Sequence, residues 1–223
     1  MAPMRFGAVP LLGLAFAAGA VDALSFLSLG EVFTANMTGN IVLLGLALGT
    51  GHTEHALGSG LALAAFMTGL AAGFFLLKGA GDRSLRPLAG LTGELALLVA
   101  MAVGWAAQTP RPALIVLSGT AMGLQSAITR WVCDATVSTT YVTGTLTSMA
   151  GQIIGPPAAR SGARWPLAVV LALAAGAVFA ALALRLYPPA APLVAPAVVA
   201  LATSWWAIRD WGRGRPLLGA GGR

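Results

Sequence analysis

Six long runs with almost no charge constrain this chain more than any other feature of its sequence. A membrane-spanning helix needs about 20 mostly apolar residues, and each run meets that length with at most one charged residue. The runs cover residues 8–29, 56–78, 88–108, 112–133, 166–187 and 190–208. The pattern predicts an all-α fold, a polytopic membrane helix bundle with six spanning helices.

The composition excludes a soluble protein. Of the 223 residues, 57% are apolar and only 9% are charged, whereas soluble domains average about 45–50% apolar and about 25% charged residues. We therefore expect residues 1–223 to form a single membrane domain with a basic cytoplasmic tail at 209–223. The net charge is +6, and most of the basic residues lie between the apolar runs. This is typical of orienting charges at membrane edges and gives no reason to expect nucleic-acid binding.

Two further apolar segments are shorter and carry their polar residues in their first halves. They are Phe33–Gly49 and Thr139–Gly155. Irregular backbone at membrane depth is tolerated only where it is buried in protein or lines a wet cavity. We predict that both segments are re-entrant or broken, with Gly39 and Gly144 as the candidate break points because glycine accepts unusual backbone angles and close contacts.

The distribution of basic residues favours this topology over eight full spans. With six spans, the inner side holds Arg5, Lys78, Arg83, Arg86, Arg130, Arg160, Arg164, Arg209, Arg213, Arg215 and Arg223, and the outer side holds Arg111 and Arg185. That is eleven against two, whereas eight spans divide the same residues eight against five. Cytoplasmic loops are enriched in Lys and Arg. The charges therefore predict a multi-pass membrane protein with both termini in the cytoplasm.

The two short segments belong to an internal repeat. Gly19-Ala-Val-Asp-Ala matches Gly123-Leu-Gln-Ser-Ala, and Thr38-Gly-Asn matches Thr143-Gly-Thr. The repeat halves cover about 8–108 and 112–208, with three spanning helices each. An odd number of spans per half predicts that the second half enters the membrane inverted. Inverted repeats recur in transporters, with the binding site at the repeat interface near the middle of the membrane.

The same motifs carry a resemblance to a known family. The stretches Gly19-x-x-Asp-Ala-x-Ser-Phe-Leu-x-Leu-Gly, Val32-Phe-x-Ala-Asn-Met-Thr-Gly-Asn and Thr139-Thr-Tyr-Val-Thr-Gly-Thr resemble the YoaK-type family. The resemblance covers nearly the whole chain, and the Asn-Met-Thr-Gly-Asn stretch is its most specific part. It implies a bacterial inner-membrane protein of single-domain size, and it implies no activity. Ser126 stands where the first copy of the repeat has an acid.

Asp22 is the most informative polar residue because it lies well inside the first span. An unpaired aspartate there costs about 2.5–3.5 kcal/mol on insertion scales. It is either a proton, cation or substrate site, or a structural carboxylate that caps a broken segment. The other candidate substrate- or ion-binding residues cluster at the two motifs: Asn36, Thr38, Gly39, Asn40, Gln125, Ser126, Tyr141, Thr143, Gly144 and Thr145. Alternatively, these side chains only satisfy backbone groups freed by the glycines.

Glu94 is a second acid within a span and is a candidate for a proton path, although snorkelling to the membrane edge or placement near the N-terminus of the helix would also explain it. His52, Glu54 and His55 crowd into a glycine-rich loop, and we expect a solvated loop there and no metal site. No nucleotide, zinc or catalytic-triad motif occurs, so neither a cofactor nor an enzymatic activity is expected.

These observations predict a small transporter or facilitator in contact with membrane lipid. Its cargo would be a small polar solute or cation, bound between the two Thr-Gly motifs, and its transport could be proton-coupled. The alternative is a non-transporting membrane partner or assembly subunit. The sequence leaves the oligomeric state open.

The topology can be tested with single cysteines at Ser84 and at Ser161, each in a Cys133→Ser background. Two crossings precede the first position and four precede the second, so both should be protected from an impermeant thiol reagent in intact cells. Labelling of Ser84→Cys with protection of Ser161→Cys would instead establish eight spans and a parallel repeat.

Overall fold

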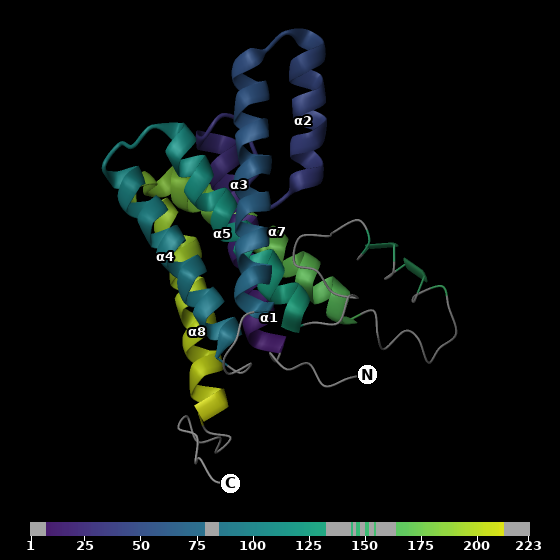
Figure 1. Ribbon diagram of the computed structural model, residues 1–223, viewed down its shortest axis with the longest axis vertical. Coiled ribbons are helices and arrows are strands. Elements are labelled where there is room, and N and C mark those ends of the chain that lie inside the picture. Colours follow the sequence, from purple (N-terminus) through teal and green to yellow (C-terminus); the bar gives the residue numbers. More distant parts are fainter. Residues whose placement is uncertain are drawn as a thin grey trace.

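The computed structural model describes residues 8–78, 85–132, 144, 146–147, 150–151, 154 and 164–211. Its regular elements are α1 (Ala8–Ser28), α2 (Met37–Thr50), α3 (Thr53–Lys78), α4 (Arg86–Ala106), α5 (Arg111–Val132), α7 (Arg164–Leu186), the 3-10 helix η2 (Pro188–Leu193) and α8 (Val194–Trp211). Every regular element among the described residues is helical (Figure 1). The predicted all-α bundle is confirmed.

Six of these segments are long and apolar enough to cross a membrane. They are Val9–Ser28, Thr53–Lys78, Arg86–Ala106, Arg111–Val132, Trp165–Leu186 and Pro188–Ile208. Each coincides with a predicted span to within a few residues at either end. The last span begins as a 3-10 turn because it opens on two consecutive prolines, Pro188 and Pro189, and proline has no N–H for an α-helical hydrogen bond.

One apolar cluster fixes the direction in which every span runs. It joins Leu24 and Leu29 at the end of α1, Ala62 near the start of α3, Met101 near the end of α4, Leu114 near the start of α5, Leu184 at the end of α7 and Ala191 in η2. The helices α1, α4 and α7 therefore end where α5 and η2 begin and beside the first half of α3, toward the upper end of Figure 1. Hence α1 runs opposite to α5, α3 opposite to α7, and α4 opposite to α8.

These directions also show that the first short segment adds no crossing. The helices that flank α2 meet at the upper end, and Gly58 in α3 contacts Val32 just after α1. The helix α2 forms a hairpin with the first part of α3 at that end (Figure 1). The connection from α5 to α7 likewise begins and ends at the opposite end of the bundle. The segment between α5 and α7 lies largely outside the described residues, which contain six candidate spans.

The contact between α3 and α5 is made by glycines that bring the two backbones together. A Cβ atom on Gly123 would overlap the carbonyl oxygen of Phe66 and would lie 2.8 Å from the amide nitrogen of Leu70. A Cβ atom on Gly69 would overlap the carbonyl oxygen of Thr120. Small residues at such positions let membrane helices approach closely, so this helix pair depends on both glycines.

The contact between α1 and α7 repeats this arrangement. A Cβ atom on Gly19 would overlap the carbonyl oxygen of Leu173 and would lie 3.2 Å from the amide nitrogen of Ala177. A Cβ atom on Gly176 would overlap the carbonyl oxygen of Phe16. The first helix of each half thus packs against the middle spanning helix of the other half.

The two contacts correspond position by position. One constant spacing in the sequence relates Gly19 to Gly123 and Phe16 to Thr120, and a second constant spacing relates Phe66 to Leu173 and Gly69 to Gly176. The corresponding helices of the two halves also run in opposite directions. Both features are those that an inverted repeat produces. The two halves are interleaved and share one core.

The glycine contacts predict a large difference between two similar substitutions. Gly123→Ala places a methyl group on the backbone of α3, and overpacking of this kind typically costs about 1–3 kcal/mol. Gly45→Ala in α2 meets no atom within 4 Å and should leave stability unchanged or slightly raised, because alanine favours helix. Thermal unfolding in detergent measures both, and equal melting temperatures would contradict the packing described here.

Candidate functional site

The chain folds back on α1 immediately after that helix ends. The turn uses Gly30 at a φ of 100°, a conformation that glycine adopts without a Cβ clash. Phe33 then stacks on Phe26 with 4.9 Å between the ring centroids, and the hydroxyls of Thr34 and Ser25 are hydrogen-bonded at 3.1 Å. The fold-back segment, residues 29–36, therefore runs back along the last two turns of α1.

Asp22 holds the deepest point of this fold-back segment. Its Oδ1 atom accepts the backbone N–H of Thr34 at 2.8 Å and that of Ala35 at 2.7 Å. Hydrogen bonds to an ionised carboxylate are stronger than those between neutral groups, and the two N–H groups have no helical partner. Of the two interpretations of Asp22, the geometry matches the structural carboxylate that caps a broken segment.

The Asn-Met-Thr-Gly-Asn motif builds the start of α2. The side-chain amide of Asn40 accepts the N–H of Phe33 at 2.9 Å and donates to its carbonyl oxygen. Asn36 is the N-cap, and its Oδ1 accepts the N–H of Gly39 at 3.3 Å. A Cβ atom on Gly39 would lie 2.8 Å from the Phe33 ring. The side chains of this motif therefore form hydrogen bonds with the backbone of neighbouring residues. This matches the alternative in which they only satisfy backbone groups of the broken segment.

The first motif therefore does not present all its polar side chains to one buried site. Asn40 is buried, whereas Asn36 and Thr38 are exposed. The expected re-entry is present, because the fold-back segment returns to the depth of Asp22. The expectation that Asn36 and Thr38 converge with the second motif stays a prediction, because that motif lies largely outside the described residues.

The second motif falls largely outside the described residues. Tyr141, Thr143 and Thr145 are among the residues of which nothing is described, and Gly144 is helical and half-buried. How these four residues meet the first motif therefore stays a prediction.

Gln125 and Ser126 lie in the interior at the start of the second repeat motif. Gln125 is 0% exposed, and its Nε2 donates to the carbonyl oxygen of Leu14 in α1 at 3.1 Å. The Gln125 Oε1 and the buried Ser126 Oγ have no hydrogen-bond partner among the described residues. This is where the first helices of the two halves are joined by a polar contact.

Glu94 is the most unusual polar group in the described part of the chain. It is 0% exposed, and neither carboxyl oxygen has a hydrogen-bond partner among the described residues. Gly93 beside it contacts Leu124 of α5, and Gly90 one turn earlier contacts Ile128. Glu94 therefore lies against α5 near the level of Gln125. This burial is inconsistent with snorkelling of the Glu94 side chain to the membrane edge. The only sequence signal for the burial of Glu94 was its isolated position in an apolar run.

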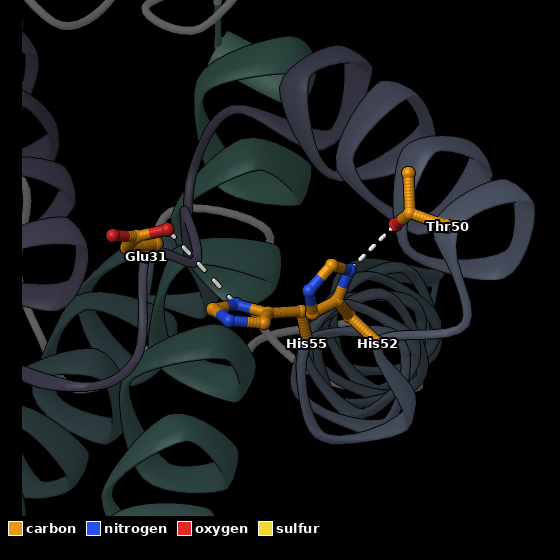
Figure 2. Close-up of polar contacts among 4 residues, drawn as sticks. All are labelled: Glu31, Thr50, His52 and His55. Carbon is orange, nitrogen blue, oxygen red and sulfur yellow. Dashed lines mark hydrogen bonds and ion pairs between the residues drawn. The ribbon is translucent and has the colours of Figure 1, made fainter.

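A separate polar group lies at the outer tip of the α2–α3 hairpin (Figure 2). The Nδ1 atom of His55 is 4.0 Å from a carboxyl oxygen of Glu31, and these side chains are 48% and 65% exposed. Thr50 and Nδ1 of His52 are hydrogen-bonded at 2.7 Å. No group of three His, Cys, Asp or Glu residues in the described ranges could hold a metal ion. The expected loop is wrong for Glu54 and His55, which lie in the first turn of α3, although both side chains are exposed.

Comparison with known proteins yields a family and one curated relative. Residues 11–205 match a family described as "Protein of unknown function (DUF1275)". The chain is 40% identical over 148 residues to the UPF0700 transmembrane protein YoaK of Bacillus subtilis (strain 168). This match covers 64% of the chain and 65% of the length of that relative. No solved structure matches.

The capping geometry predicts how Asp22 responds to substitution. Asp22→Ala leaves two buried N–H groups without an acceptor, and each such loss costs about 1–3 kcal/mol. Asp22→Asn keeps an acceptor oxygen and should retain most of the stability. Ser126→Ala, at the corresponding position of the second half, removes a hydroxyl without a described partner and serves as the matched control. Thermal unfolding in detergent separates these cases, and an Asp22→Ala variant as stable as Ser126→Ala would exclude the capping role.

Proposed function

We propose that this chain, which belongs to the DUF1275 family of transmembrane proteins, is a small transporter or facilitator for a small polar solute. The packing of the first helix of each half against the middle spanning helix of the other supports this proposal. Transporters built from inverted repeats bind their cargo where the halves meet and where helices are interrupted. Here the fold-back segment interrupts the path from α1 to α2 at the depth of Asp22.

The observation that carries the proposal is the pair of unpartnered polar atoms beside that interface. Buried side-chain oxygens are normally hydrogen-bonded, and an unmet buried group costs about 1–3 kcal/mol. Gln125 Oε1 and Ser126 Oγ are such groups among the described residues, and a polar solute could supply the missing bonds. No basic side chain accompanies them among the described buried residues, so we infer that the solute is neutral or cationic.

We also infer the orientation of the protein in a bacterial inner membrane. Lys78, Arg86 and Arg130 lie at the lower end of the bundle, whereas Arg111 and Arg185 lie at the upper end. With the basic segments that follow α8 and precede α1, the excess of positive charge favours a cytoplasmic lower end. Both termini would then be cytoplasmic.

The second candidate function is a non-transporting partner or assembly subunit. The outward face of α2 favours it, because Gly45 and Gly49 on that helix have nothing within 4 Å and the neighbouring Leu46 is exposed. Such a face could receive a helix of another protein. It could equally lie against lipid, so transport remains the better supported function.

Thermal stabilisation against a panel of small metabolites tests transport while the solute is still unidentified. A ligand at 100 times its Kd stabilises the folded protein by about 2.7 kcal/mol. The stabilising compound should act on wild type but not on Gln125→Leu, and it should enter liposomes that contain the protein. Ser118→Ala is the control, because its hydroxyl on the same helix is already bonded to the carbonyl oxygens of Leu114 and Ile115.

Two results would contradict the proposal. One is a panel in which no compound stabilises wild type. The other is stabilisation that is unaffected in Gln125→Leu, with no solute flux and a stoichiometric co-purifying protein. The second result would support the assembly subunit.

A further inference from the structure

We propose that Glu94 and Gln125 form an exchangeable proton-binding site in the centre of the bundle, in which the carboxyl group of Glu94 carries the proton and donates a hydrogen bond to the amide oxygen of Gln125. The site itself rests on the geometry of α4 and α5. Its use as the coupling site of a carrier rests on the function proposed above, in which the solute and the proton of Glu94 compete for the same Gln125 oxygen.

The first step in the argument is that Glu94 is far from any compensating charge. Glu94 lies eight residues after Arg86, which is about 12 Å along a helix. The charged and titratable residues of the helices packed against α4 lie at helix ends: Glu54, His55 and Lys78 on α3, Arg111 and Arg130 on α5, and Arg209 and Asp210 on α8. Asp22 on α1 is bonded to the fold-back segment. No charged group described in these helices is positioned to neutralise a carboxylate at Glu94.

The second step is that an added proton removes this problem and creates a new requirement. An unpaired carboxylate inside a membrane protein is electrostatically costly. The neutral acid avoids that cost, but it has an O–H group that needs an acceptor. A carboxyl group at this position is therefore best satisfied when it holds a proton and lies close to a free acceptor oxygen.

Gln125 provides that acceptor. The amide nitrogen of Gln125 is assigned by its partner, because the Leu14 carbonyl oxygen can only accept a hydrogen bond. The amide oxygen must then be the free end of the side chain, and it has no described partner. The contacts of Gly93 with Leu124 and of Gly90 with Ile128 place Glu94 beside this stretch of α5. Neutral Glu94 thus lacks an acceptor for its O–H group, and the amide oxygen of Gln125 lacks a donor.

The third step is that the fold itself does not require an acid here. Leu91 and Leu98, one turn to either side of Glu94 on the same face, pack in the shared apolar core. Counting back from Trp105 in α4 and from Trp205 and Trp206 in α8, the corresponding residues in the second half are Val194 and Ala195. An apolar residue would fill this place without an electrostatic cost, which points to a role beyond packing.

Infrared spectroscopy of the purified full-length protein tests the site without a known solute. The difference between wild type and Glu94→Gln should contain the carbonyl band of a protonated carboxylic acid. That band should be lost as the pH is raised and should shift when the protein is moved into D2O. Glu54→Gln, which changes an exposed acid on the hairpin, should not remove it. In Gln125→Leu the same band should shift to higher frequency, because the acid loses its acceptor, and this variant keeps the test valid if Glu94→Gln does not fold.

Three results would overturn the proposal. The first is a wild-type spectrum without a carboxylic acid band that depends on Glu94. The second is a band that responds neither to pH nor to D2O, which would make Glu94 a static neutral acid. The third is loss of the band when NaCl is added, which would identify a cation site. The metabolite panel and the flux assay are independent of this spectrum, so the failure of the proton site and the failure of the transport proposal can be distinguished.

Discussion

The whole bundle depends on direct contact between helix backbones at four glycines. Gly19 and Gly176 join α1 to α7, and Gly69 and Gly123 join α3 to α5. Inside a membrane the lipid chains are as apolar as the side chains, so helices associate through close packing and hydrogen bonds. These contacts bring the first helix of each half into the other half. They therefore create both the shared core and the interface beside which the unpartnered polar atoms lie.

The spans and their directions were accessible from the sequence because each depends on local information. An apolar run has its hydropathy whatever its neighbours are, and the basic residues at the ends of the runs indicate which ends share a side. The re-entrant segment was also visible in part, since Phe33–Gly49 is too polar in its first half to face lipid. The chain turns at Gly30, however, and the expected break at Gly39 is wrong because Gly39 lies in the first turn of α2. The corresponding stretch of the second half lies largely outside the described residues.

The chemistry of the individual side chains was less accessible. The sequence offered two interpretations of Asp22, and the choice between them depends on where the N–H groups of Thr34 and Ala35 lie, which no spacing along the chain specifies. For Glu94 the sequence allowed either burial or snorkelling, and the register of α4 against α5 decides for burial. In both cases the missing information is the position of a partner in space. The Asn-Met-Thr-Gly-Asn motif, which is the most specific part of the family resemblance, holds the local backbone. Glu94, which belongs to no motif, is buried without a described partner.

The interleaving of the halves also bears on how the protein is made. A membrane helix enters the bilayer as it is synthesised, so α1 is present long before α7, the helix against which Gly19 packs. The hydrogen-bond donors of Asp22 lie in the segment that directly follows α1. The aspartate can therefore form its hydrogen bonds before α7 has been synthesised. Neither half can reach its final packing alone. The last two spans complete the contacts of the first, and a ribosome that stops between the halves would leave two glycine faces in lipid.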